Sequence, residues 1–201
     1  MKMSKTSKIR VLGFDPGLSH TGWNLSEIDL ENGALNVVKL GEFSPSGTAD
    51  KATYREESEK YGKRTISLAV LRETIAQLLT ELKPDYIVME DAFINPKRPM
   101  AYGALSMWHC TARMVARDVA GKAIIVIPAK SAKLGVSGRG DSGKVNIQQA
   151  VVTNPKIHFK NEKLMQGLTE HCADSIGLSY SFMTMYLPSI ISEANAIAKL
   201  L

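Results

Sequence analysis

The sequence predicts an α/β fold in which a mixed five-stranded sheet is flanked by helices. Three strand-like segments come first, and helical and strand-like segments alternate after them. Two of the strand-like segments end in acidic residues, which places negative charge at one edge of the predicted sheet. The length of 201 residues favours one domain with a short appendage. We expect this domain over residues 1–187, with residues 188–201 as its C-terminal helical extension.

Turn residues separate the first three predicted strands, which span residues 8–15, 21–25 and 34–43. Pro16 and Gly17 make a turn after the first strand. Residues 31–33 (ENG) are typical of the hairpin turn between the second strand and the third. Residues 44–51 are polar and contain Gly and Pro, so we expect a loop there.

A long helix follows, because apolar residues recur at helical spacing: Ile66, Val70, Leu71, Ile75, Leu78, Leu79 and Leu82. Pro84 stops this helix. Residues 86–89 form a continuous apolar run, as in a strand that is buried on both faces. A crossover through the long helix should return this strand parallel to the first one.

The segment 100–119 reads as a helix that is apolar or small on nearly all sides. A helix of this kind has to bury more than one face, which predicts both a core contact and a subunit interface. We expect Ala104, Trp108 and Val115 to provide that burial. The remaining predicted elements are a strand at 123–127, helices near 142–153 and 168–186, and a short amphipathic helix in 188–201.

Asp15 and Glu90 each follow a buried strand, and the two strands are predicted to be parallel neighbours. The two carboxylates should therefore lie side by side at the edge of the sheet where ligands bind in open α/β folds. A carboxylate at the end of a buried strand is costly unless it is paired or binds a cation. The sequence favours a divalent cation, although either acid alone could also cap a turn.

A third acid lies in the helix that starts near Leu168. Asp174 is one helical turn after both Glu170 and His171, so one face of this helix presents Asp174 with either partner. Oxygen ligands with an optional imidazole suit Mg²⁺ or Mn²⁺. The alternative is an ordinary solvated helix face.

The composition fits a globular protein with a polyanionic partner. Lys and Arg number 25 against 20 Asp and Glu, which gives a formal net charge of +5. The first ten residues are basic and polar without an apolar secretory core, and no run approaches the roughly 18 apolar residues of a membrane span. Cys110 and Cys172 are too few for a disulfide framework, so we expect a cytoplasmic protein.

Four motifs in order resemble the RuvC family of Holliday-junction resolvases. They are residues 14–17 (FDPG) with Thr21-Gly22, residues 88–90 (VME) with Phe93, residues 127–129 (IPA) through Lys133, Gly138, Gly140 and Lys144, and residues 171–175 (HCADS). The resemblance runs from about residue 9 to residue 185. It implies a dimeric RNase H-like nuclease that uses two Mg²⁺ or Mn²⁺ ions and nicks two strands symmetrically across a four-way DNA junction.

The resemblance also implies a role for each matching residue. Asp15, Glu90 and Asp174 become metal ligands, and His171 becomes the fourth group of the active site. Lys144 joins this catalytic set, and Lys133 accompanies it near the scissile strand. Phe93 becomes an aromatic that stacks on bases at the crossover. We assign the nearby Lys97 and Arg98, and Arg139 of the Gly-rich basic stretch, to DNA binding as well.

The chain departs from the family in length. Asp15 and Glu90 are 75 positions apart (90 − 15), which enlarges the region 26–61, and the segment 188–201 also looks additional. These features fit a divergent, phage-type member in a bacterium or a virus-infected cell. They bear on the cleavage sequence and the strictness for four-way junctions more than on the chemistry.

Three other functions compete with the nuclease. A non-catalytic branched-DNA-binding protein could keep the same fold, but it would not need all three acids. An actin-like ATPase needs two such domains, which 201 residues do not hold. Residues 138–144 (GRGDSGK) have the spacing of a P-loop, but Val145 stands where a P-loop requires Ser or Thr.

Overall fold

The computed structural model describes residues 8–92, 99–138 and 144–198. The strands are β1 (Lys8–Asp15), β2 (Thr21–Asp29), β3 (Ala34–Phe43), β4 (Tyr86–Glu90), β5 (Ile124–Ile127) and β6 (Ile157–Phe159). They form one sheet in the order β5-β4-β1-β2-β3-β6. The first three strands are an antiparallel meander, and β4, β5 and β6 each join the sheet in parallel. The mixed sheet is as the sequence predicts.

The sheet has one strand more than the sequence predicts. β6 is only three residues long and pairs with Leu35–Val37 at the outer edge of β3. Its three residues (IHF) alternate between apolar and polar, but alternation predicts a strand only over about four to eight residues.

The helices are α1 (Pro45–Ala49), α2 (Arg55–Tyr61), α3 (Lys63–Leu82), α4 (Pro99–Ala120), α5 (Ala129–Ser137), α6 (Lys144–Thr153), α7 (Glu162–Gln166), α8 (Glu170–Ser181) and α9 (Leu187–Ala198). A 3₁₀ turn (Ala52–Tyr54) precedes α2, and a π-helical turn (Phe182–Tyr186) joins α8 to α9. Within the described ranges, none of the helices combines the length and the apolar character that crossing a membrane requires.

The expectation of a loop at 44–51 is wrong, because α1 forms inside this segment. The hydroxyl of Ser44 accepts a hydrogen bond from the backbone N–H of Gly47, and Pro45 occupies the first helical position. A capping Ser followed by Pro is a helix-start signal. The Gly and Pro content of the segment concealed it.

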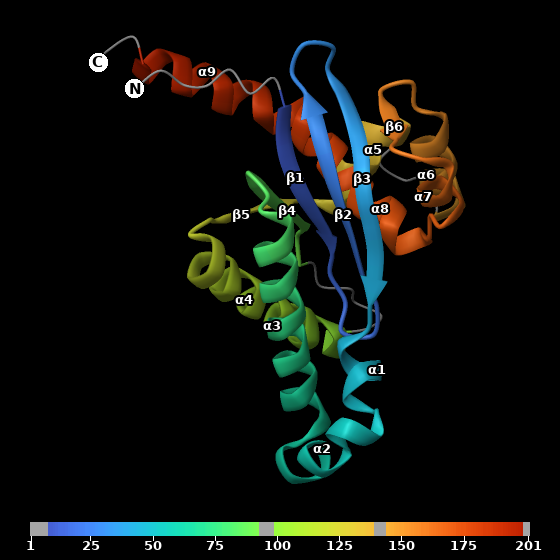
Figure 1. The fold of residues 1–201 in the computed structure, drawn as a ribbon, viewed down its shortest axis with the longest axis vertical. Helices are drawn as coiled ribbons and strands as arrows, with labels where there is room; N and C mark the ends of the chain where they lie inside the picture. The colour runs from blue at the N-terminus through green and yellow to red at the C-terminus, as the bar shows by residue number, and fades with distance from the viewer. Residues whose placement is uncertain (1–7, 93–98, 139–143, 199–201) are drawn as a thin grey trace.

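Two layers of helices cover the two faces of the sheet (Figure 1). α3 and α4 pack on one face, where Leu12 and Phe14 of β1 meet Leu71, Ile75 and Trp108. The helices α5, α6, α8 and α9 build the core on the other face, against residues that include Val11 of β1. Successive residues of β1 thus serve opposite cores, as the pleat of a strand requires.

The inner face of α4 serves the core, which corrects the expectation that Trp108 and Val115 provide subunit contacts. Trp108 is 0% exposed and Val115 is 3% exposed. The Trp108 ring packs edge-on against Phe14, with 5.8 Å between ring centroids. The exposed side chains of α4 include Met107 and Met114, at 38% and 66% exposure. An apolar helix pattern cannot tell which face meets the sheet and which faces outward.

α8 lies unusually close to the sheet, because glycines stand where it crosses β1 and β2. A Cβ built on Gly22 would lie 2.3 Å from the backbone carbonyl of His171. A Cβ on Gly13 would lie 2.6 Å from the carbonyl oxygen of Ser175. Under the helix, the side-chain amide of Asn24 donates to the hydroxyls of Ser175 and Ser179, which satisfies these buried polar groups.

Gly22→Ala is expected to lower the free energy of unfolding by about 1–3 kcal/mol, because the new methyl group forces α8 away from β2. Gly103→Ala in α4 is the matched control, since nothing lies within 4 Å of the built Cβ. The control should be neutral or stabilising by up to about 1 kcal/mol through helix propensity. Urea unfolding of both variants measures the difference, and equal stabilities would contradict the close seating of α8.

Candidate active site

Asp15 and Glu90 lie at adjacent strand ends. β1 and β4 are parallel, with Phe14 opposite Met89 in the register, so the next residue of each strand is an acid at the same edge. Both side chains are half-buried. The adjacency predicted from the strand order is confirmed.

α8 brings two further groups to this edge. The helix begins at Glu170, and its N-cap Thr169 accepts a hydrogen bond from the backbone N–H of Cys172 at 3.2 Å. His171 then lies in the first turn, where its Nδ1 is hydrogen-bonded to Oδ2 of Asp15 at 2.6 Å. The first turn of α8 therefore brings the imidazole of His171 into contact with the carboxylate of Asp15 at the end of β1.

Asp174 lies one turn further along α8 and shares a small hollow with Glu90. Lys133 of α5 lines the same hollow, together with the apolar side chains of Ala132 and Ile147. The hollow thus holds two carboxyl groups and one ammonium group between α5, α8 and the end of β4. Lys133, for which the family resemblance implies a place near the scissile strand, thus lies beside two of the three predicted acids.

The electrostatics of the site oppose ionisation of its acids. Burial, followed by the charges of Asp15 and Asp174, raises the pKa of Glu90 from 4.5 to about 8. Burial and the charge of Asp15 raise the pKa of Asp174 to about 6, while Lys133 and His171 act in the opposite direction. Carboxylates that repel one another in a half-buried place gain from any cation that joins them.

The donors fit a divalent cation by their chemistry. Asp15, Glu90 and Asp174 offer carboxylate oxygens, which Mg²⁺ and Mn²⁺ prefer, and His171 adds a nitrogen. Among the residues that the structure describes, no three acids, histidines or cysteines stand close enough to enclose an ion. Binding would therefore have to draw these side chains together, against a repulsion that the cation itself removes.

The hydrogen bond to Asp15 affects His171 in turn. This bond, opposed by burial and assisted by the charges of Asp15 and Glu42, raises the pKa of His171. The paired imidazole is therefore cationic over a wider pH range than an isolated one. Glu170, the other candidate from the helix face, contributes charge to both Asp174 and His171.

Most of the remaining predicted site residues lie outside the part of the chain that the structure describes. Phe93, Lys97, Arg98 and Arg139 lie outside the described residues. Lys144 begins α6, but its side chain is outside the description.

The structure adds residues that the sequence did not indicate. His20, in the turn between β1 and β2, lies flat against His171. Glu42, at the end of β3, accepts a hydrogen bond from the hydroxyl of Thr169. Both positions depend on contacts between distant segments, and neither residue stands in a pattern that marks it in the sequence.

Comparison with known proteins points to one family. No protein-family model matches the chain. The chain is 30% identical over 157 residues to a crossover junction endodeoxyribonuclease RuvC of Methylorubrum populi, covering 77% of this chain and 74% of the relative. It is 26% identical over 166 residues to the RuvC of Rhizobium etli, covering 80% of this chain and 85% of the relative.

Solved structures support the fold. Thermus thermophilus RuvC in complex with a Holliday junction substrate superposes with a TM-score of 0.61 at 15% identity, over 86% of this chain and 92% of that chain. A yeast mitochondrial Holliday junction resolvase gives a TM-score of 0.65 at 14% identity, over 87% of this chain and 78% of that chain. The RNase H-like fold expected from the sequence is confirmed.

Glu90→Gln is expected to stabilise the metal-free protein at alkaline pH. The pKa of Glu90 is about 8 in the folded state against 4.5 as its ordinary value. A group whose folded pKa is raised contributes stability that is present below pH 4.5 and is lost as the pH rises through 8. In EDTA the variant should exceed the wild type by about 2–4 kcal/mol at pH 8.5, the order of magnitude for such a shift, and match it near pH 5.

Guanidinium unfolding at the two pH values measures this difference. Glu73→Gln, which changes an exposed acid of α3, is the matched control and should shift neither value. A gain for Glu90→Gln that is equal at pH 5 and pH 8.5 would contradict the raised pKa.

Proposed function

The chain belongs to the RuvC family of crossover junction endodeoxyribonucleases, and from that membership we propose that it cuts four-way (Holliday) DNA junctions by divalent-metal-dependent hydrolysis. The observation that carries the proposal is the meeting of Asp15, Glu90 and Asp174 with His171 at one edge of the sheet. These four groups come from three segments far apart in the chain. Their burial and mutual repulsion are costs that a metal-binding role explains.

The proposed chemistry divides between the cations and the protein. Asp15, Glu90 and Asp174 would hold two cations, and Mg²⁺ or Mn²⁺ suits this oxygen-rich set. When bound, the cations would supply activation of a water molecule and charge stabilisation for the leaving oxygen of a phosphodiester. His171 turns Nδ1 to Asp15, which leaves Nε2 to ligate an ion or to move a proton of the attacking water.

Lys133 would act on the phosphate. It lies in the same hollow as Glu90 and Asp174, where its ammonium group offsets part of their charge. The ammonium group of Lys133 would reduce the repulsion between an approaching phosphate and the three carboxylates. It would also stabilise the negative charge that develops during hydrolysis. We propose the same general role for Lys144, and DNA binding for Phe93, Lys97, Arg98 and Arg139.

A homodimer would supply the two sites that paired symmetric nicks require. The outer face of α4 is the surface that we propose for the contact. Met107, Cys110 and Met114 are exposed there at intervals of three and four residues, so they form one stripe along the helix. An exposed apolar stripe opposite the core-facing Trp108 is what a helix shared between two subunits needs.

Asp15→Asn is expected to abolish cleavage of a synthetic four-way junction and to leave binding within about threefold of the wild type. The substitution removes a carboxylate that serves the cations, and less negative charge near the DNA does not weaken phosphate contacts. Nicking and gel-shift assays in Mg²⁺ and in Mn²⁺ measure both properties on one preparation. Loss of binding by a folded variant would contradict the metal role of Asp15.

His171→Ala is expected to lower the nicking rate by at least about tenfold, because it removes a group that contacts Asp15. Glu170→Gln is the neighbouring control and should cost less than about threefold. Single-turnover nicking rates of both variants decide between the two residues. If the Glu170 variant is the slower one, the register of α8 described above does not produce the active site.

Met107→Glu combined with Met114→Glu is expected to convert a dimer into a monomer at micromolar concentration. Two new carboxylates on each subunit would have to be buried on association, which is costly. Multi-angle light scattering measures the mass, and an exposed change on α3, Arg72→Glu, is the control. A wild-type monomer that still makes paired nicks would overturn the dimer.

A further inference from the structure

We infer that His20 is a positioning residue that holds the imidazole of His171 with Nδ1 toward Asp15. The inference rests on the proposed function, because it assigns His20 a role only through His171. It goes beyond that function, since His20 lies outside the four motifs that carry the family resemblance.

The contact itself is specific in geometry. The rings of His20 and His171 are 5.6 Å apart between centroids, and their planes differ by only 6°. This separation is within the range of offset-stacked aromatic pairs. The two residues are 151 positions apart in the sequence, so the turn between β1 and β2 and the first turn of α8 must both be in place for the rings to meet.

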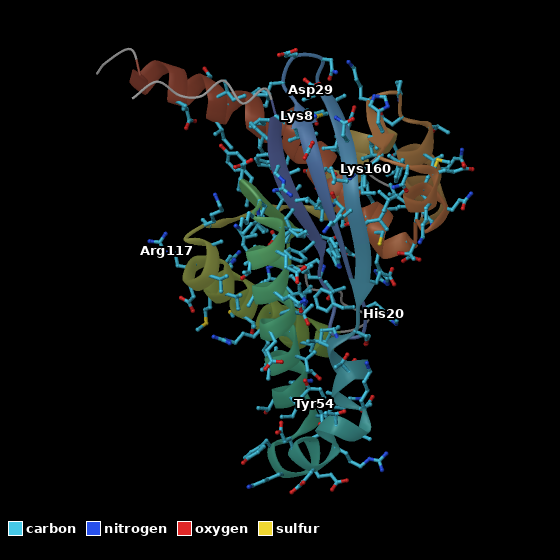
Figure 2. All side chains as sticks on the ribbon, in the orientation of Figure 1. Lys8, His20, Asp29, Tyr54, Arg117 and Lys160 are labelled. Atoms are coloured by element: carbon cyan, nitrogen blue, oxygen red, sulfur yellow. The ribbon has the colours of Figure 1, made fainter. Side chains whose placement is uncertain are left out.

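The turn that carries His20 is held from several sides. The hydroxyl of Thr21 donates to the carbonyl oxygen of Gly17 at 2.6 Å, and it accepts from the indole N–H of Trp108 at 3.1 Å. A Cβ on Gly17 would lie 2.3 Å from the carbonyl oxygen of His20, so the turn closes tightly on itself. The backbone of His20 is therefore fixed although its ring is exposed. Figure 2 shows His20 at the end of β3 nearest α1.

His171 needs such a support. Its side chain is 33% exposed, and the hydrogen bond to Asp15 fixes one ring nitrogen. A single hydrogen bond leaves the ring free to tilt about it, and the last side-chain torsion of histidine has broad wells. A flat neighbour restricts that tilt. With Asp15 at one ring atom and His20 against one face, both the direction of Nδ1 and the plane of the ring are defined.

A direct role for His20 predicts a different pattern of variants. If His20 contacted a phosphate or transferred a proton, any residue without a polar ring atom would fail. If it acts by stacking, a Phe at this position keeps the flat surface and should replace it. The comparison of His20→Phe with His20→Ala therefore separates the two roles, and His158→Ala, which removes an exposed histidine of β6, is the matched control.

The first measurement does not depend on activity. Nitrogen-15 NMR of the imidazole rings is recorded on the metal-free protein in EDTA at one fixed alkaline pH, at which the rings are neutral and a single tautomer has two distinct nitrogens. The chain has four histidines, so the four single substitutions assign them. His20→Ala should shift the His171 ring signals and move its two nitrogens toward averaged values, whereas His20→Phe should keep two distinct nitrogens. His171 signals that do not change in His20→Ala would overturn the inference.

The second measurement uses a four-way junction under single-turnover conditions with Mg²⁺. His20→Ala should lower the cleavage rate by about threefold to tenfold with the dissociation constant for the junction within twofold, the scale of one aromatic contact. His20→Phe and His158→Ala should both stay within twofold of the wild type. A His20→Phe variant as slow as His20→Ala, or a parallel loss of junction binding, would overturn the positioning role.

If the proposed function itself is wrong, the measurements on the wild type give a different result. In that case the wild type itself would not cleave the junction, and Mn²⁺ titrated by calorimetry would give no binding heat. The NMR comparison would still decide whether His20 orders His171 in the metal-free protein.

Discussion

The close seating of α8 on β1 and β2 is the constraint on which the rest of the site depends. Gly13 and Gly22 have no side chain where the helix crosses, and the Asn24 amide joins the helix hydroxyls beneath it. Only at this distance can His171 reach Asp15. The sheet edge alone would offer two acids, and the helix alone would offer an acid and an imidazole. Packing of the helix on the sheet brings these four groups to the same edge of the sheet.

The same packing makes the site costly to the fold. Carboxyl groups are drawn into a half-buried place where Glu90 and Asp174 resist ionisation. Lys133 offsets part of this cost from α5, and the paired imidazole of His171 offsets another part. A site of this kind lowers the stability of the metal-free protein, and binding of a cation to the folded state raises that stability again.

Much of this arrangement could be predicted from local patterns and strand order. The position of Asp15 beside Glu90 follows from the rule that parallel strands end at one edge, and the helical spacing of His171 and Asp174 needs only the period of the α-helix. The sequence could not show which side of α4 holds Trp108, because that face is chosen by the partner surface. It could not show β6 or His20 either, since each is defined by a contact with a distant segment. Local periodicity contains no information about such pairings.

The π-helical turn between α8 and α9 has a consequence for how the C-terminal segment reaches the core. In a regular α-helix, residues five apart point about 140° away from each other, so Phe182 and Leu187 would face different ways. In the wider π-helical turn, the N–H of Leu187 donates to the carbonyl of Phe182, which brings the two residues closer to the same side of the helix. Both side chains are in fact buried in the same core. The π-helical turn thus determines the rotation of α9 about its own axis, and with it which side chains of α9 face the core.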